Sequence, residues 1–167
     1  MTKRIQNIPL IKFNGVGNSG NMPVGNYVFY FRYSDVDGNQ TDYVAESGVV
    51  SCFKGNDADP FSIDGGFENE NSGKNVSFKL TNIDPSYDYM IVDWSRSTSA
   101  VNNSRKTMIK TISKTYPVIN GECNIIITGD EETEDITADS LNSQYTVFGS
   151  VKSMAQAQNM LFQANVT

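Results

Sequence analysis

The side chains that carry most enzyme chemistry are missing from this sequence or are spaced poorly for it. The 167 residues include no histidine, so the usual general base and the commonest transition-metal ligand are absent, and no Ser-His or Cys-His pair can form. Paired carboxylates remain a route to glycoside hydrolysis, but no pair is selected by its spacing. The composition therefore favours a structural or binding module over an enzyme, with no catalytic residue and no cofactor predicted.

Two groups of acidic residues have the oxygen chemistry that Ca²⁺ prefers. The first group consists of Asp35, Asp37, Asn39 and Asp42. Its glycine, Gly38, comes two residues too early for an EF-hand loop, and Asp-Gly-Asn is ordinary hairpin chemistry, so a turn is favoured over a calcium site. The second group, residues 130–135, is favoured as a solvated acidic linker over a metal site.

The two cysteines, Cys52 and Cys123, each lie in an apolar segment typical of a strand. Buried cysteine behaves as a small apolar residue, and nothing in the sequence indicates an oxidising compartment. Two buried thiols are therefore favoured, and a disulfide between them is the alternative.

Gly15, Gly17 and Gly20 match the GxGxxG pattern of dinucleotide-binding loops. Such a loop must open a helix whose N-terminus holds the pyrophosphate, whereas Met22-Pro23-Val24-Gly25 and a strand follow here. Nucleotide binding is not predicted.

The composition and net charge limit the kinds of partner that the chain can bind. Hydrophobic residues make up 38%, enough to build a core, and the net charge of −6 disfavours nucleic acid or an anionic membrane, since both require a basic surface. No stretch approaches the roughly 20 apolar residues of a membrane span, and the first ten residues lack the apolar core of a signal peptide.

Alternating apolar and polar residues predict an all-β chain. The clearest strand covers residues 27–33, with Tyr27, Phe29, Phe31 and Tyr33 on one face, and a hairpin turn at residues 37–39 follows it. Further strands are expected at residues 8–13, 43–53, 76–81, 89–94, 106–114, 116–119 and 123–128, the last two around an Asn120-Gly121 turn. Loops are expected at residues 14–26, 54–75 (with a short edge strand near 61–63) and 95–105.

This pattern divides the chain into three parts. Residues 1–128 are expected to form an immunoglobulin or fibronectin III-like β-sandwich, and residues 129–139 an acidic linker with a helical turn near Asp139. Residues 140–167 are a short mixed extension, with a strand-like start and a Met/Ala/Gln-rich stretch suited to a helix. This extension is expected to belong to a larger domain or to dock on a partner, and to become ordered only there. The interface residues predicted in it are Met160, Leu161 and Phe162.

Residues 80–89, LTNIDPSYDY, resemble the corner between strands E and F of fibronectin type III domains. Ile83, Pro85 and Tyr89 occupy the apolar, proline and tyrosine positions of that corner. The resemblance implies that the tyrosine hydrogen-bonds back to the chain and fixes the corner of the sandwich. The usual early tryptophan is missing, and Asp93 stands where alternation from Tyr89 predicts an apolar residue.

A broader resemblance is to tail muzzle or nozzle-type virion proteins of crAss-like bacteriophages. It rests on residues 23–51 (PVGNYVFYFRYSDVDGNQTDYVAESGVVS), on the corner at 80–89, and on residues 150–166 (SVKSMAQAQNMLFQANV). The resemblance implies a virion subunit assembled in the bacterial cytoplasm, near the portal end of the tail. Its implied partners are other tail proteins and copies of itself in a ring around the genome exit channel, without direct readout of nucleic acid.

The main alternative is a carbohydrate-binding or adhesive β-sandwich from a phage fibre or a bacterial surface. It requires an exposed row of aromatic side chains that would take a glycan as partner. The candidates for that row are Tyr30, Tyr43, Tyr87 and Trp94.

Overall fold

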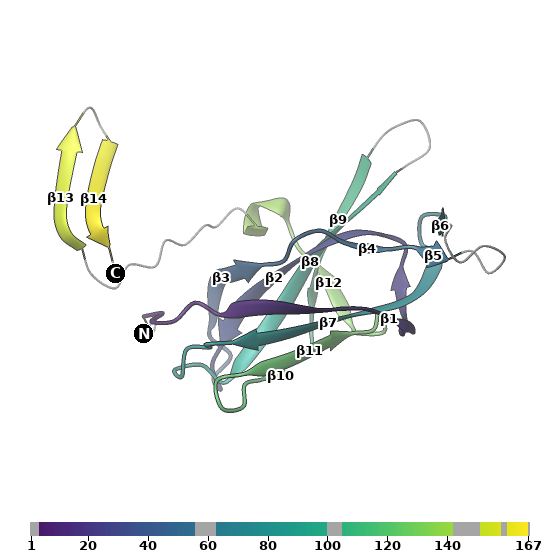
Figure 1. Cartoon of the computed structure of the whole chain (residues 1–167), viewed down its shortest axis with the longest axis horizontal. Helices are drawn as coiled ribbons and strands as arrows, with labels where there is room; N and C mark the ends of the chain where they lie inside the picture. The colour runs from purple at the N-terminus through teal and green to yellow at the C-terminus, as the bar shows by residue number, and fades with distance from the viewer. Residues whose placement is uncertain (1–3, 56–62, 100–104, 142–150, 158–159, 167) are drawn as a thin grey trace.

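The computed structural model describes residues 4–55, 63–99, 105–141, 151–157 and 160–166, and these form an all-β chain. Two antiparallel sheets pack face to face as a sandwich, and two small two-stranded sheets accompany them (Figure 1). The predicted β-sandwich fold is confirmed. The elements are β1 (Leu10–Pro23), β2 (Gly25–Ser34), β3 (Gln40–Glu46), β4 (Val50–Cys52), β5 (Lys54–Gly55), β6 (Ile63–Gly65), β7 (Asn71–Thr81), β8 (Tyr89–Ser99), β9 (Arg105–Ile112), β10 (Tyr116–Pro117), β11 (Cys123–Ile127), β12 (Thr133–Asp135), the 3-10 helix η1 (Ala138–Leu141), β13 (Val151–Ala157) and β14 (Met160–Val166).

The smaller sheet of the sandwich has the strand order β1-β7-β11, and the larger has β12-β9-β8-β2-β3, with β4 beside β2 and β10 beside β8. In an immunoglobulin-type sandwich, strands A, B, E and D share one sheet, and strands C, F and G share the other. By sequence order and pairing, β1 and β7 correspond to B and E, and β2, β8 and β9 correspond to C, F and G. β11 takes the place beside E.

The core is built from the inward residues of both sheets, as the alternating pattern predicts. Tyr27, Phe29, Phe31 and Tyr33 of β2 are fully buried, and their rings face the other sheet. Phe78 of β7 lies at the centre, with ring centroids 5.2 Å from Phe29 and 5.4 Å from Phe31.

The stretch at residues 14–26, predicted as a loop, is instead mostly strand: β1 continues to Pro23. The pairing with β7 shifts register after Phe13 and again after Gly17, so the extra residues are absorbed as bulges. Gly20 lies so close to β7 that a Cβ there would stand 2.3 Å from the Lys74 carbonyl oxygen. Gly20 therefore permits the close approach of the bulged strand to β7, because a side chain there would not fit, whereas Gly15 has open space around it and suits the bulge through its positive φ of 113°.

Two other predicted connections also contain strand. Residues 95–99 extend β8 and pair with β9, and β7 begins at Asn71, inside the predicted loop 54–75. Ile63–Gly65 forms a short strand paired with Lys54–Gly55, while residues 61–62 of the predicted edge strand lie outside the described part. In each case pairing with a neighbouring strand outweighs the weak local preference of a polar sequence.

The acidic segment at residues 129–139 differs from a free linker. Thr133–Asp135 forms β12, which pairs with β9 and adds an edge to the large sheet. The helical turn expected near Asp139 is present as η1.

The Met/Ala/Gln-rich stretch is a hairpin of β13 and β14, which corrects the expectation of a helix there. Met160, Phe162, Ala164 and Val166 recur at every second position, and this period favours a strand despite the helix-forming residue types. Residues 142–150, with the predicted strand-like start, lie outside the described residues.

Candidate interaction surface

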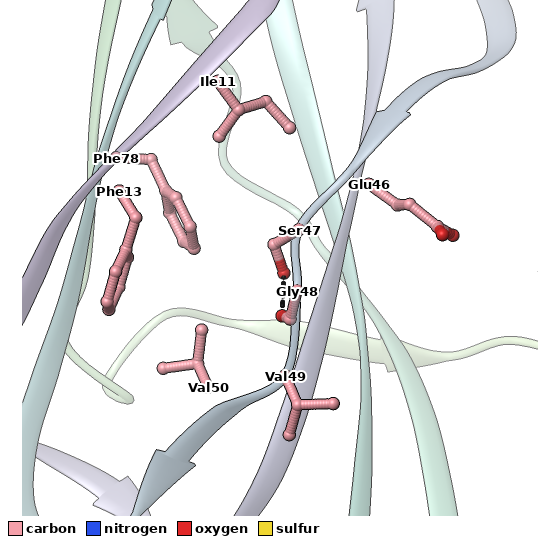
Figure 2. Close-up of a pocket in the computed structure, with 8 residues that line it drawn as sticks. All are labelled: Ile11, Phe13, Glu46, Ser47, Gly48, Val49, Val50 and Phe78. Atoms are coloured by element: carbon pink, nitrogen blue, oxygen red, sulfur yellow. Dashed lines mark hydrogen bonds between the residues drawn. The ribbon is translucent and has the colours of Figure 1, made fainter.

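An apolar groove opens between the edge of the small sheet and the connection from β3 to β4. Its volume is about 320 Å³, and it is lined by Ile11, Phe13, Glu46, Ser47, Gly48, Val49, Val50 and Phe78 (Figure 2). Phe13 is 49% exposed and Val49 is 69% exposed, although both are large apolar residues. Adjacent exposed apolar side chains of this kind mark interaction sites more often than scattered single ones.

Residues of the hydrophobic core form the floor of the groove. The ring of Phe13 packs on Phe78 with centroids 5.5 Å apart, and Phe78 in turn contacts the buried rings of β2. In the register of β1 and β7, Phe13 lies opposite Phe78 and Ile11 opposite Leu80, so both β1 residues face inward. Phe13 remains exposed because β1 is the last strand of its sheet, and no described strand covers it from the side.

The opposite wall is held in place by Ser47. The Ser47 N–H donates to the Phe29 carbonyl over 2.8 Å, and the Phe29 N–H donates to Ser47 Oγ over 2.9 Å. The Ser47 hydroxyl itself donates to the Gly48 carbonyl over 2.8 Å (Figure 2). These bonds fix the connection against β2, so Val49 is presented from an ordered backbone.

The start of β1 is fixed by a buried carboxylate, Asp84, in the turn between β7 and β8. Asp84 Oδ2 accepts the N–H groups of Gln6 and Asn7 at 2.5 and 3.2 Å, and Oδ1 accepts the Ser86 N–H at 2.9 Å. Burial by itself raises the pKa of Asp84, but the hydrogen bonds from Gln6, Ser86 and Asn7 together lower it below its ordinary value. The segment before β1 is therefore tied to the corner of the sandwich.

Tyr33 completes this tie. Its hydroxyl donates to the Asn7 carbonyl over 2.9 Å and accepts the Asp84 N–H over 3.3 Å, while its ring stacks on Tyr87 at 4.8 Å. Burial is the main cause that raises the pKa of Tyr33 to about 12. Sequence reasoning recognised Tyr33 only as a core residue; the polar turn containing Asp84 was the signal that a buried hydroxyl would find partners there.

A second buried carboxylate lies on the outward face of the large sheet. Asp93 of β8 is fully buried, accepts a hydrogen bond from the Tyr43 hydroxyl, and forms an ion pair with Arg32 at 3.3 Å. Arg32 also donates to Thr111 Oγ1 over 3.3 Å. Asp93 breaks the apolar alternation counted from Tyr89 because that face is outward: Met90, Val92 and Trp94 fill the core from β8.

Comparison with known protein families identifies the chain. The family model described as Crassvirus muzzle protein matches residues 3–167. The chain belongs to the Crassvirus muzzle protein family. It is therefore a structural component of a bacteriophage virion, and the resemblance seen in residues 23–51 and 150–166 is confirmed. No curated protein matches the chain.

In this muzzle family chain, the predicted calcium ligands form a turn. Asp35 Oδ1 accepts the N–H groups of Asp37 and Asn39 at 3.0 and 2.9 Å, and the Asn39 amide donates to both carboxylate oxygens. Asp42 lies beyond this turn, on β3. The described residues contain no group of three His, Cys, Asp or Glu side chains placed to hold a metal ion, so a calcium site gains no support.

The three residues predicted to form the corner, Ile83, Pro85 and Tyr89, differ in how far they are buried. Ile83 is buried and Pro85 is exposed, and Tyr89 is half-buried as the first residue of β8. Within the described part of the chain, the tyrosine that ties this corner to the backbone is Tyr33. The role proposed for Tyr89 stays a prediction.

The four aromatic candidates for glycan binding do not form an exposed row. Tyr87 and Trp94 are core residues, and Tyr30 and Tyr43 lie half-buried against each other on the outward face, with centroids 5.5 Å apart.

Cys52 and Cys123 are both buried free thiols, as the favoured interpretation expected. Burial raises the pKa of Cys52 to about 11 and that of Cys123 to about 12.

The predicted interface residues Met160, Leu161 and Phe162 lie on β14, and the description of that strand is limited to its backbone pairing with β13. Among the described residues, no helix is long and apolar enough to cross a membrane.

Proposed function

We propose that this chain is a repeated structural subunit of the tail apparatus near the portal, and that it acts through protein–protein contacts within a ring. The observation that carries the proposal is the apolar groove between β1 and the β3–β4 connection in a member of the muzzle family. A virion subunit works by contacting its neighbours, and such contacts bury apolar side chains at their centre.

The composition of the groove supports this role. Phe13 and Val49 provide apolar area at the rim, and Glu46 and Ser47 provide polar groups beside it. This combination of an apolar centre with polar surroundings is typical of subunit interfaces. A catalytic site would require reactive groups, and the groove offers a single carboxylate.

The charge of the chain suits a position near the genome channel. With a net charge of −6, a ring of copies would present an acidic surface, and DNA phosphates are repelled by such a surface. DNA would then pass without being held by the ring.

The position in the virion can be tested by immunogold labelling of purified phage particles with antibodies raised against this chain. We expect label at the tail, close to the portal vertex. Label distributed over the capsid shell would overturn the proposed location.

The contact surface can be tested by native mass spectrometry of the full chain at high protein concentration. We expect multimers in the wild-type chain and a shift toward monomer in Val49→Asp, because the substitution places a charge in the groove. Ile126→Asp is the matched control, since Ile126 is a similarly exposed aliphatic residue on β11 that does not line the groove. A monomeric wild type, or equal effects of both substitutions, would argue against the groove as an interface.

A further inference from the structure

The strand order of the sandwich leaves one position empty. In the correspondence given above, β1 is strand B, and strand A would lie beside it on the same sheet. Within the described residues no strand pairs with that side of β1, although near its end the Asn21 N–H donates to the Thr128 carbonyl over 2.6 Å. The small sheet therefore has three strands, against the five of the β12-β9-β8-β2-β3 path, and β1 lies at its edge (Figure 1). A strand added next to β1 would lie over β3 and β4.

The apolar groove is the area that such a strand would cover. Phe13 of β1 forms one side, Val49 the other, and Phe78 the floor. The unpaired edge of β1 adds backbone N–H and C=O groups, which another strand can pair with directly. The site therefore has both components of strand addition: a hydrogen-bonding edge and an apolar pocket next to it.

Residues 6–8, which precede β1, do not fill this position. Gln6 and Asn7 donate their N–H groups to Asp84, and the Asn82 amide donates to the Ile8 carbonyl over 3.1 Å. These bonds hold residues 6–8 at the turn between β7 and β8, at the end of β1 rather than along its side.

The hairpin of β13 and β14 has the properties of a donor. Its two strands pair only with each other among the described strands, and an isolated two-stranded hairpin is marginally stable in water. The register pairs Val151 with Val166, Ala155 with Phe162 and Ala157 with Met160, and these positions share one face of the hairpin. Apart from Ser153, which lies opposite Ala164, the residues at these positions are apolar by type, and such residues suit contact with another apolar surface. β14 has seven residues, enough to follow β1 across the groove.

The charges of the two parts are complementary. The chain carries a net charge of −6, and residues 151–166 contribute one lysine and no acid, so the rest of the chain carries −7. Two acidic sandwiches repel each other, whereas a hairpin bearing only Lys152 approaches the groove and its Glu46 without repulsion.

We propose that β14 of one copy adds to the β1 edge of another copy, so that the hairpin of each subunit fills the groove of the next. This inference rests on the proposed function and names the segment that occupies its interface. A neighbouring copy is the occupant that agrees with the proposed function, because a hairpin that filled the groove of its own copy would leave this groove closed to contacts between subunits. A donor and an acceptor on different surfaces make a head-to-tail contact, and such contacts form a ring when the rotation from copy to copy closes.

The test uses the full chain with the photo-crosslinking amino acid p-benzoylphenylalanine in place of Phe13, prepared separately with ¹⁴N and ¹⁵N and then mixed. After irradiation, mass spectrometry identifies the peptides joined to position 13. We expect crosslinks to residues 160–166 with both isotopes present in one crosslinked pair. The same probe at Ile126, outside the groove, is the control and should not label these residues.

Three results would overturn the proposal: crosslinks from position 13 to 160–166 only within chains of one isotope, crosslinks to other segments only, or no crosslink. If native mass spectrometry of the same sample shows multimers, such a result rejects β14 as the occupant and leaves the proposed subunit role standing. If the sample is monomeric throughout, the proposed subunit role fails together with this inference.

Discussion

The hydroxyl of Tyr43 donates a hydrogen bond to the carboxylate of Asp93, across the outward face of the large sheet. Asp93 is fully buried, and a buried carboxylate is tolerated only when its oxygens have partners. Arg32 supplies the ion pair and Tyr43 the second partner. Burial, followed by the contact with Asp93, raises the pKa of Tyr43, so its hydroxyl stays protonated at neutral pH.

Removing this hydroxyl should destabilise the sandwich. For Tyr43→Phe we expect the free energy of unfolding, measured by urea denaturation, to fall by about 1–3 kcal/mol, because a buried oxygen of Asp93 loses its partner. Tyr30→Phe is the control: Tyr30 packs beside Tyr43, and its effect should stay within about 0.5 kcal/mol. Equal stability of Tyr43→Phe and the wild type would show that Arg32 alone satisfies Asp93.

Asp84 should make stability depend on acid pH. Its pKa in the folded chain is lowered from 3.8, so its contribution is present above that value and is lost as the pH falls through the folded pKa. We expect Asp84→Asn to lower the free energy of unfolding at pH 7 by about 1–3 kcal/mol, and the difference from the wild type to shrink below about pH 4. Denaturation at a series of pH values measures this. Asp37→Asn, at an exposed turn position, should show no such convergence.

Alanine substitutions at two glycines with positive φ should distinguish the stability cost of backbone strain from the cost of a steric clash. Gly129 (φ 92°) lies so close to β1 that a Cβ would stand 2.6 Å from the Met22 nitrogen, whereas Gly38 (φ 81°) has nothing within 4 Å of that position. Gly38→Ala should cost about 1–2 kcal/mol from conformation alone. Gly129→Ala should cost more, because Met22 must also move; thermal unfolding of the two variants compares them. A smaller loss in Gly129→Ala would mean that the start of the acidic segment can shift away from β1.

The two thiols should be unreactive in the folded chain. Neither Cys52 nor Cys123 should react with Ellman's reagent at pH 8, because both are buried and protonated, and both should react in 6 M guanidinium chloride. Because burial raises their pKa values from 9.0, folding stability is intact below pH 9 and falls as the pH rises through about 11 and 12. A single reactive thiol in the native chain would place one cysteine at the surface, and none after unfolding would reveal a disulfide.

The sequence predicted the parts of the fold in which residue type and environment agree. The alternation in β2 identified its buried face, and Asn120-Gly121 identified a turn in which both residues have positive φ. The corner at Ile83 and Pro85 correctly separated β7 from β8, although the hydroxyl that ties this corner belongs to Tyr33.

The interaction surface could not be predicted, because it depends on pairing between distant segments. Phe13 and Val49 are 36 positions apart in the printed sequence, and each is an ordinary strand-type residue by itself. They become neighbours because β1 is an edge strand and Ser47 fixes the β3–β4 connection against β2. The same limit explains β1, in which glycine and asparagine form a strand only because β7 lies beside them.

β12 forms one edge of the large sheet, and unlike the β1 edge of the small sheet it is short and acidic. β12 has three residues, Thr133, Glu134 and Asp135, and Asp135 forms an ion pair with Lys110 of β9 at 3.5 Å. A short acidic edge discourages further pairing, since an approaching strand meets negative charge and few free backbone groups. Strand addition at the β12 edge is therefore disfavoured, and this edge of the large sheet is protected against pairing with the sheet of another molecule.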